Sequence, residues 1–171
     1  MTAKPPIRKK PKPRDLDAIV NSLRRIVRAI RVSSHAAEKT SGISGAQLFV
    51  LRQLLDEPGM SLRDVARRTL TDESSVSVVV TRLVERGFVK RRPGARDRRC
   101  VELSPTAAGR ALARRAPEPA QARLVSALRE VSARRLHVLS AVLNHVADRM
   151  GVANDPAAMF FEADPTPRTR K

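Results

Sequence analysis

The sequence predicts a mainly α protein with a small β-hairpin wing (α+β), and three observations carry this prediction. Residues 61–86 contain the pattern of two short helices separated by a turn. A strongly basic segment with turn residues at its centre follows in residues 88–103. Long apolar periodicities flank this stretch on both sides, in residues 15–39 and 106–150. This order favours a winged helix-turn-helix with flanking N- and C-terminal helices.

Capping residues mark the ends of the two short helices. Ser61 stands three positions before Asp64, which is a variant of the capping box and predicts a helix start. Thr71 and Asp72 are the next capping pair, and Gly87 is expected to end the second helix because glycine takes the left-handed conformation without steric cost. Between them, one apolar face is predicted from residues spaced by four and three: Val76, Val80 and Leu83.

The opposite face of the second helix carries small hydroxyl side chains and an arginine. Small side chains allow a helix to lie deep in a major groove, where hydroxyl groups can contact base edges or phosphates. A solvated helix surface is the alternative interpretation of such a face. The candidates for major-groove contact are Ser74, Ser75, Ser77, Val78 and Arg82.

Residues 88–92 and 99–103 are predicted to form two short strands, joined by a loop that begins with Pro93 and Gly94. Arginine at a loop tip is suited to the narrow minor groove, where the negative potential is enhanced. Asp97 could brace the hairpin through an ion pair and leave neighbouring arginines available to DNA. The minor-groove candidates are Arg96, Arg98 and Arg99.

With these motifs in place, the chain resembles the MarR (multiple antibiotic resistance regulator) family of bacterial transcription factors. The most specific part of the resemblance is a D-x-R wing motif followed by an apolar strand, a serine and a glycine. The residues that match it are Asp97, Arg99, Val101, Leu103, Ser104 and Gly109.

The resemblance implies an obligate homodimer that binds double-stranded DNA. Its recognition helices would enter successive major grooves of a pseudo-palindrome, and its wings would enter minor grooves. Repression is favoured over activation because blocking a promoter requires only occupancy. The implied organisation is a basic arm (1–14), one domain (15–150) with the winged helix-turn-helix (43–105) between dimerisation helices (15–39 and 106–150), and a C-terminal extension (151–171).

The flanking segments are predicted to be helical. Residues 15–39 form an amphipathic helix of roughly 24 residues, and residues 43–55 form a further helix. Residues 106–128 are predicted as one helix, kinked at its two prolines. The last helix begins at Ser132, and its apolar stripe is expected to join subunits or, alternatively, to face the protein's own core. That stripe is Leu136, Leu139, Leu143, Val146 and Met150.

Charge points to a polyanionic partner. The net charge is +17 and the sequence pI is about 11.6, which favours a polyanionic partner such as nucleic acid, with an anionic membrane surface as the competing partner. A non-specific or architectural nucleic-acid-binding protein driven by its basic arms is therefore the alternative function. Residues 1–14 are expected to be disordered when free, as is part of residues 151–171. Three apolar residues in that extension are expected to dock on the partner subunit: Met159, Phe160 and Phe161.

Other functions lack their sequence signals. No apolar run of about 18 residues predicts a transmembrane helix. The single cysteine fits a reducing cytoplasm, where a DNA-bound protein would associate with the bacterial nucleoid. Cys100 is expected to be an ordinary strand cysteine, with a redox sensor as the alternative. The three histidines lack the spacing of a zinc site, so no metal or cofactor is expected, and no catalytic motif predicts an enzyme.

The resemblance also implies a small effector that weakens DNA binding. Such effectors would bind between the dimerisation helices and the DNA-binding lobe. The chain has no Trp or Tyr and four Phe, so an aromatic-walled pocket is hard to build. We therefore expect a small anionic or apolar effector, with Arg31, His35 and Arg52 as the candidate binding residues.

Overall fold

The computed structural model describes residues 12–94, 100–155 and 157–160 of the 171-residue chain. These residues form seven helices and one two-stranded sheet, which confirms the predicted mainly α fold with a β-hairpin. In chain order the elements are α1 (Pro13–Ser41), α2 (Gly45–Asp56), α3 (Leu62–Thr69), α4 (Glu73–Glu85), β1 (Val89–Pro93), β2 (Val101–Pro105), α5 (Ala107–Arg115), α6 (Ala120–Arg129) and α7 (Ala133–Met150).

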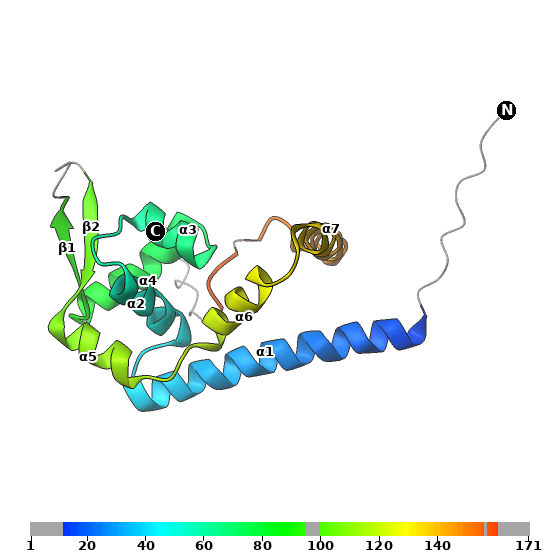
Figure 1. Cartoon of the computed structure of the whole chain (residues 1–171), viewed down its shortest axis with the longest axis horizontal. Helices are drawn as coiled ribbons and strands as arrows, with labels where there is room; N and C mark the ends of the chain where they lie inside the picture. The colour runs from blue at the N-terminus through cyan, green and yellow to red at the C-terminus, as the bar shows by residue number, and fades with distance from the viewer. Residues whose placement is uncertain (1–11, 95–99, 156, 161–171) are drawn as a thin grey trace, which may run out of the picture.

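Helices α2 to α5 and the β1–β2 hairpin pack together, and we call them the winged unit (Figure 1). Helix α2 lies at its centre, because α1, α3, α4, α5, α6 and β2 all contact it. Seven of the 12 residues of α2 are buried, so this helix is covered on most sides. A capping box starts it: the Gln47 amide donates to Ser44 Oγ at 3.1 Å, and the Ser44 amide donates to Gln47 Oε1 at 3.4 Å.

The hairpin is antiparallel, with Val89 opposite Pro105 and Arg91 opposite Leu103. Its base is fixed to the winged unit because Val89 and Leu103 are both buried. The Leu103 amide also donates to the carbonyl of Met60 at 2.8 Å. The two strands lie one or two residues later in the chain than predicted.

The prediction of a single kinked helix in residues 106–128 is wrong. Helix α5 ends before Ala116, whose backbone is extended, and α6 begins after Pro119. A proline lacks the backbone donor that a helix needs and disfavours helical geometry in the residue before it. The chain therefore breaks into two helices, and the amide of Ala120 donates to Ser33 Oγ at 3.0 Å, which fixes the start of α6 against α1.

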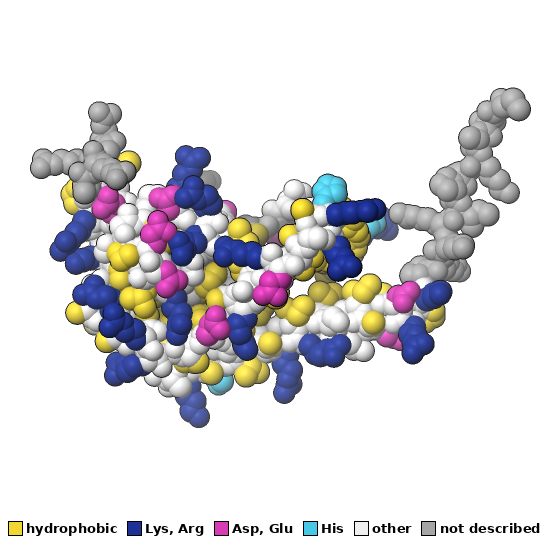
Figure 2. Space-filling model, in the orientation of Figure 1, with side chains coloured by type: hydrophobic (Ala, Val, Ile, Leu, Met, Phe, Trp, Pro, Cys, Tyr) yellow, Lys and Arg dark blue, Asp and Glu magenta, His cyan; other side chains and the backbone are white. Residues whose placement is uncertain are grey.

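Helices α1 and α7 leave apolar side chains uncovered. In α1, burial is confined to Ile30, Ser34 and Ala37 near its C-terminal end, and α7 has no buried residue. In Figure 2, hydrophobic side chains follow the length of α1 and gather around α7. Within the described ranges, no helix combines the length and the apolar character needed to cross a bilayer.

The segment after α7 turns back to the winged unit. Met159 is only 3% exposed and belongs to the same hydrophobic core as α2 and α4. The expectation that Met159 docks on a partner subunit is therefore wrong, because its own chain buries it. Phe160 is 46% exposed, and Phe161 lies outside the described residues.

The packing of α5 on the hairpin makes a prediction for Gly109. A Cβ atom at this position would lie 2.1 Å from the carbonyl oxygen of Phe88, closer than real Cβ atoms approach. Helix propensity alone would make Gly109→Ala stabilising by about 1 kcal/mol, whereas a forced shift of this kind costs roughly 1–3 kcal/mol. We expect net destabilisation, measured by urea unfolding at a fixed protein concentration.

The matched control is Ala108→Gly, which changes an exposed residue of the same helix. It should lower the free energy of unfolding by about 0.5–1 kcal/mol through backbone freedom alone. A gain of similar size in Gly109→Ala would contradict the close approach of α5 to the hairpin.

Candidate nucleic-acid interface

Asp72 caps α4, as predicted. Its carboxylate accepts the backbone amide of Ser75 at 2.8 Å and the Ser75 hydroxyl at 2.7 Å, and it also accepts the Ser74 hydroxyl. The hydrogen bond from the Ser74 hydroxyl, followed by those from Ser75, holds the pKa of Asp72 well below its ordinary value. The negative charge at the start of α4 is thus stabilised by local donors and by the helix dipole.

The rest of α4 divides into a buried and an outer face. The buried face consists of Val76, Val79, Val80 and Leu83, all fully buried. Their burial fixes the orientation of the helix about its own axis. On the outer side, Ser74 is exposed, and Ser75, Ser77, Val78 and Arg82 are half-buried. Because the Ser74 and Ser75 hydroxyls donate to Asp72, they retain only acceptor capacity toward a base. The groove contacts of all five residues remain a prediction.

The hairpin is bonded directly to α4. The guanidinium of Arg91 on β1 donates to Thr81 Oγ1 on α4 at 3.0 Å. Neither residue was among the sequence candidates for DNA contact. Thr81 lies four residues after Ser77, hence on the same helix face, and that spacing was the available signal.

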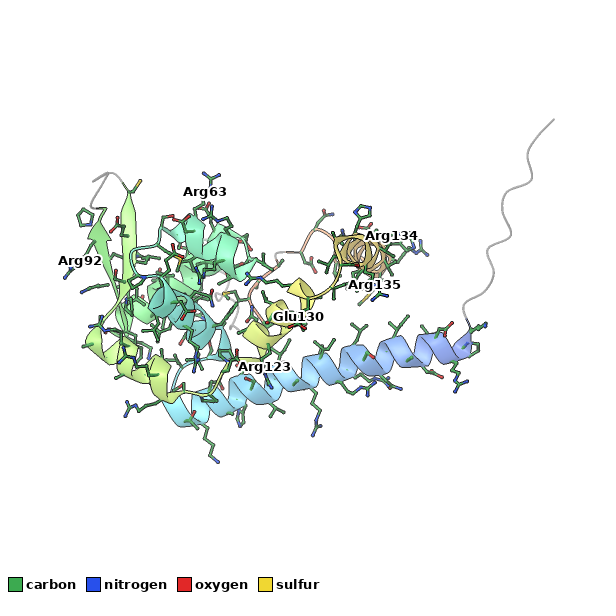
Figure 3. All side chains as sticks on the ribbon, viewed as in Figure 1. Arg63, Arg92, Arg123, Glu130, Arg134 and Arg135 are labelled. Carbon is green, nitrogen blue, oxygen red and sulfur yellow. The ribbon has the colours of Figure 1, made fainter. Side chains whose placement is uncertain are left out.

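Helix α3 adds basic side chains beside α4. Its start has the predicted capping box: the Asp64 amide donates to Ser61 Oγ, and the Ser61 amide donates to the Asp64 carboxylate, both at 3.2 Å. The Ser61 hydroxyl also donates to that carboxylate at 2.6 Å, and the hydroxyl, followed by the amide, lowers the pKa of Asp64. Arg67 pairs with Asp64 at 2.9 Å. Figure 3 shows Arg63 extending outward from α3 and Arg92 outward from the hairpin. In a helix-turn-helix the first helix crosses the DNA backbone, so Arg63 and Arg67 are suited to phosphate contact.

The wing candidates Arg96, Arg98 and Arg99 and the brace Asp97 lie outside the described residues. The strand that leads to them carries consecutive cations, and Arg91 and Arg92 are exposed. Positive charge therefore continues from the outer face of α4 onto the hairpin.

The effector candidates are divided between two helices. His35 on α1 is exposed, and its Nδ1 lies 3.9 Å from a carboxylate oxygen of Glu38. Arg31, also on α1, is exposed. Arg52 on α2 donates to the carbonyl of Ala116 and thereby fastens the connection between α5 and α6. An effector role for these residues remains a prediction.

Cys100 is exposed at the start of the hairpin's second side. Among the residues that the structure describes, no three His, Cys, Asp or Glu side chains are grouped so that they could hold a metal ion.

The α3–turn–α4 unit, with a basic hairpin bonded to α4, defines the class as a winged helix-turn-helix protein. A family model described as MarR family matches residues 41–99. The HTH-type transcriptional repressor Rv2887 of Mycobacterium tuberculosis is 31% identical over 94 residues, which are 55% of this chain and 68% of that protein. The chain belongs to the MarR family.

Two further comparisons agree with this assignment. The HTH-type transcriptional repressor MdtR of Bacillus subtilis is 28% identical over 88 residues, 52% of this chain, and the match spans little more than half, 57%, of that protein's length. A mutant MarR from E. coli complexed with operator DNA has a TM-score of 0.53 at 19% identity, over 80% of this chain and 99% of the other. This last likeness shows the fold.

The Asp72 cap makes a pH-dependent prediction, tested with Asp72→Asn, which keeps a capping acceptor and removes the charge. The folded pKa of Asp72 lies below the unfolded value, so the unfolded chain takes up the proton first as pH falls. The contribution of the charge is complete above about pH 4 and is lost as pH falls through the folded pKa. The stability advantage of the wild type over Asp72→Asn should therefore shrink below about pH 4.

Urea unfolding of both proteins from neutral pH to about pH 3 measures this difference. Asp72→Ala, which removes the cap itself, should cost about 1 kcal/mol at neutral pH. A wild-type advantage over Asp72→Asn that stays constant across the acid range would contradict the described hydrogen bonds.

The Arg91–Thr81 hydrogen bond predicts that the hairpin and α4 act together on DNA. In a double-mutant cycle, Arg91→Ala and Thr81→Val should show a coupling of about 0.5–1.5 kcal/mol in DNA affinity. If Arg91 also contacts a phosphate, Arg91→Ala should reduce the slope of log affinity against log salt by about 1. Fluorescence anisotropy at several salt concentrations measures both quantities. Arg28→Ala, on α1, is the control arginine, and strictly additive effects of the two changes would exclude the coupling.

Proposed function

We propose that the chain is a transcriptional repressor that binds a pseudo-palindromic operator as a homodimer in the bacterial cytoplasm. The proposal of DNA binding rests on the orientation of α4 about its own axis. Its valine and leucine face is fully buried, which commits Ser77, Val78 and Arg82 to the outer face, next to a basic hairpin. Two related proteins are named as transcriptional repressors, and the similar E. coli MarR was crystallised with operator DNA.

The homodimer is supported by the uncovered apolar stripes of α1 and α7. Contiguous apolar surface of this kind on a water-soluble domain marks an interaction site. Both helices project beyond the winged unit, so a second copy could cover both stripes at once (Figure 1). The exposed side chains are Leu16 (54%), Ile19 (58%), Leu23 (44%), Ile26 (40%) and Val27 (42%) on α1, with Val138 (56%), Leu139 (40%), Val142 (53%), Leu143 (45%), Val146 (45%) and Met150 (69%) on α7.

The symmetry of such a dimer suggests the form of the operator. Two identical winged units related by a two-fold axis favour two inverted half-sites, with centres about 34–36 Å apart along the DNA. The proposal includes release by a small anionic or apolar effector, which rests on the family resemblance alone.

Selection of bound duplexes from a random DNA pool, at near-physiological salt, tests the proposal. We expect a two-fold symmetric sequence that is bound about 10³–10⁷ times more tightly than random duplex. The full chain and a shortened chain of residues 12–160, which keeps all of α1 and the buried Met159, should select the same site, because the basic arm adds only phosphate attraction. Selection of no symmetric site, with binding lost in the shortened chain, would favour the architectural alternative and overturn the repressor proposal.

A further inference from the structure

Helix α7 is held at both of its ends, although none of its own residues is buried. At its start, residues 130–132 connect it directly to α6. At its end, Gly151 adopts a left-handed φ of +75°, and the amide of Val152 donates to the carbonyl of Ala147 at 3.1 Å. This arrangement is a Schellman-type ending that reverses the chain. The chain therefore turns back at Gly151 instead of continuing away from the protein.

The chain then returns to the winged unit and is anchored there by Met159. A turn follows α7, in which the amide of Asp155 donates to the carbonyl of Val152 at 3.2 Å. Figure 1 shows residues beyond α7 running back past α6 toward α2. Met159 is then 3% exposed within the core that α2 organises. A flexible, unbranched methionine is well suited to fill an irregular gap between helices.

Phe160 lies where three helices meet. It lines a small cavity with residues from α1, the start of α2 and the start of α6. The cavity has an empty volume of about 190 Å³ but room for only about one water molecule, so it is too small for a ligand. The residues around it are Ile30, Ser33, Ser34, Gly45, Pro119, Ala120 and Gln121.

We propose that Met159 anchors a C-terminal strap, formed by residues 152–155 and 157–160, that fixes the angle between α7 and the winged unit. A helix tied at one end can pivot freely about its connection, whereas a second tie at the other end restricts that motion. In the homodimer proposed above, on which this inference rests, α7 belongs to the subunit interface. The strap then sets the separation of the two winged units.

This separation matters because an operator presents its half-sites at a fixed spacing. Binding to the second half-site is favoured when the two winged units are already held at that spacing, since less freedom is lost on binding. The strap is thus a pre-organising device for two-site recognition, built from residues far from the DNA-contacting face.

The separation can be measured without knowing the operator, because Cys100 is the only cysteine of the chain and lies exposed on the hairpin. A nitroxide label at Cys100 places one spin on each hairpin of the full-length homodimer. Double electron–electron resonance then gives the distribution of distances between the two hairpins. The variants are Met159→Ala and Met159→Glu, and Met159→Leu is the control that keeps a buried apolar side chain of similar volume. Circular dichroism verifies that each variant keeps its helical content.

We expect a single narrow distance peak for the wild type and for Met159→Leu, and loss of that peak to a broad distribution in Met159→Ala and Met159→Glu. The modulation depth, which reports the fraction of dimer, should stay constant in all four proteins. Narrow peaks in every variant would overturn the strap while leaving the dimer intact. A fall in modulation depth without broadening would show that Met159 serves dimer stability only and would also overturn it. Absence of any dipolar signal in the wild type would overturn the proposed dimer, and the strap's role with it.

Discussion

The burial of α2 is the constraint on which the rest of the structure depends. Each other helix of the winged unit, together with α1, α6 and strand β2, uses α2 as a packing surface. Its residues from Ala46 to Leu51 are buried without interruption, so the helix cannot rotate or slide without opening the core. Arg52, also on α2, donates to the Ala116 carbonyl and so fixes the connection between α5 and α6 to the same helix. The winged unit is consequently expected to move as one body.

A second constraint acts on the DNA-facing surface. Asp72 places a carboxylate at the start of α4, the helix proposed to face DNA, where phosphate would repel it. The helix start needs an acceptor there, because the first backbone amides have no partner within the helix. The hydroxyls of Ser74 and Ser75 donate to Asp72 and so stabilise the capping carboxylate that the helix start needs. The same hydroxyls can then no longer donate to bases. In the proposed function, sequence discrimination would therefore rest more on Ser77, Val78 and Arg82, farther along the helix.

The features that could be predicted from the sequence are those that depend on residues close together in the chain. The caps at Ser61 and Asp72 and the helix end at Gly87 depend on residues within a few positions, and they were predicted correctly. The two prolines signalled an interruption, but its extent was underestimated, because the contact that fixes Ala120 against α1 joins residues 87 positions apart. The burial of Met159 and the bond between Arg91 and Thr81 likewise depend on how distant segments pack. No local pattern encodes these contacts.

The positive charge of the chain cannot by itself select one DNA sequence, so the arrangement of the helices must do so. A net charge of +17 attracts any polyanion, and this attraction weakens steeply as salt rises because bound counterions are released from DNA. The fixed orientation of α4 about its own axis, and the separation of the two winged units in the proposed dimer, would not depend on salt in this way. In the proposed dimer, specific binding would therefore rest on apolar packing remote from the DNA, in the core around α2, in the stripes of α1 and α7, and at Met159. The arginines provide attraction, and the buried residues determine where that attraction is directed.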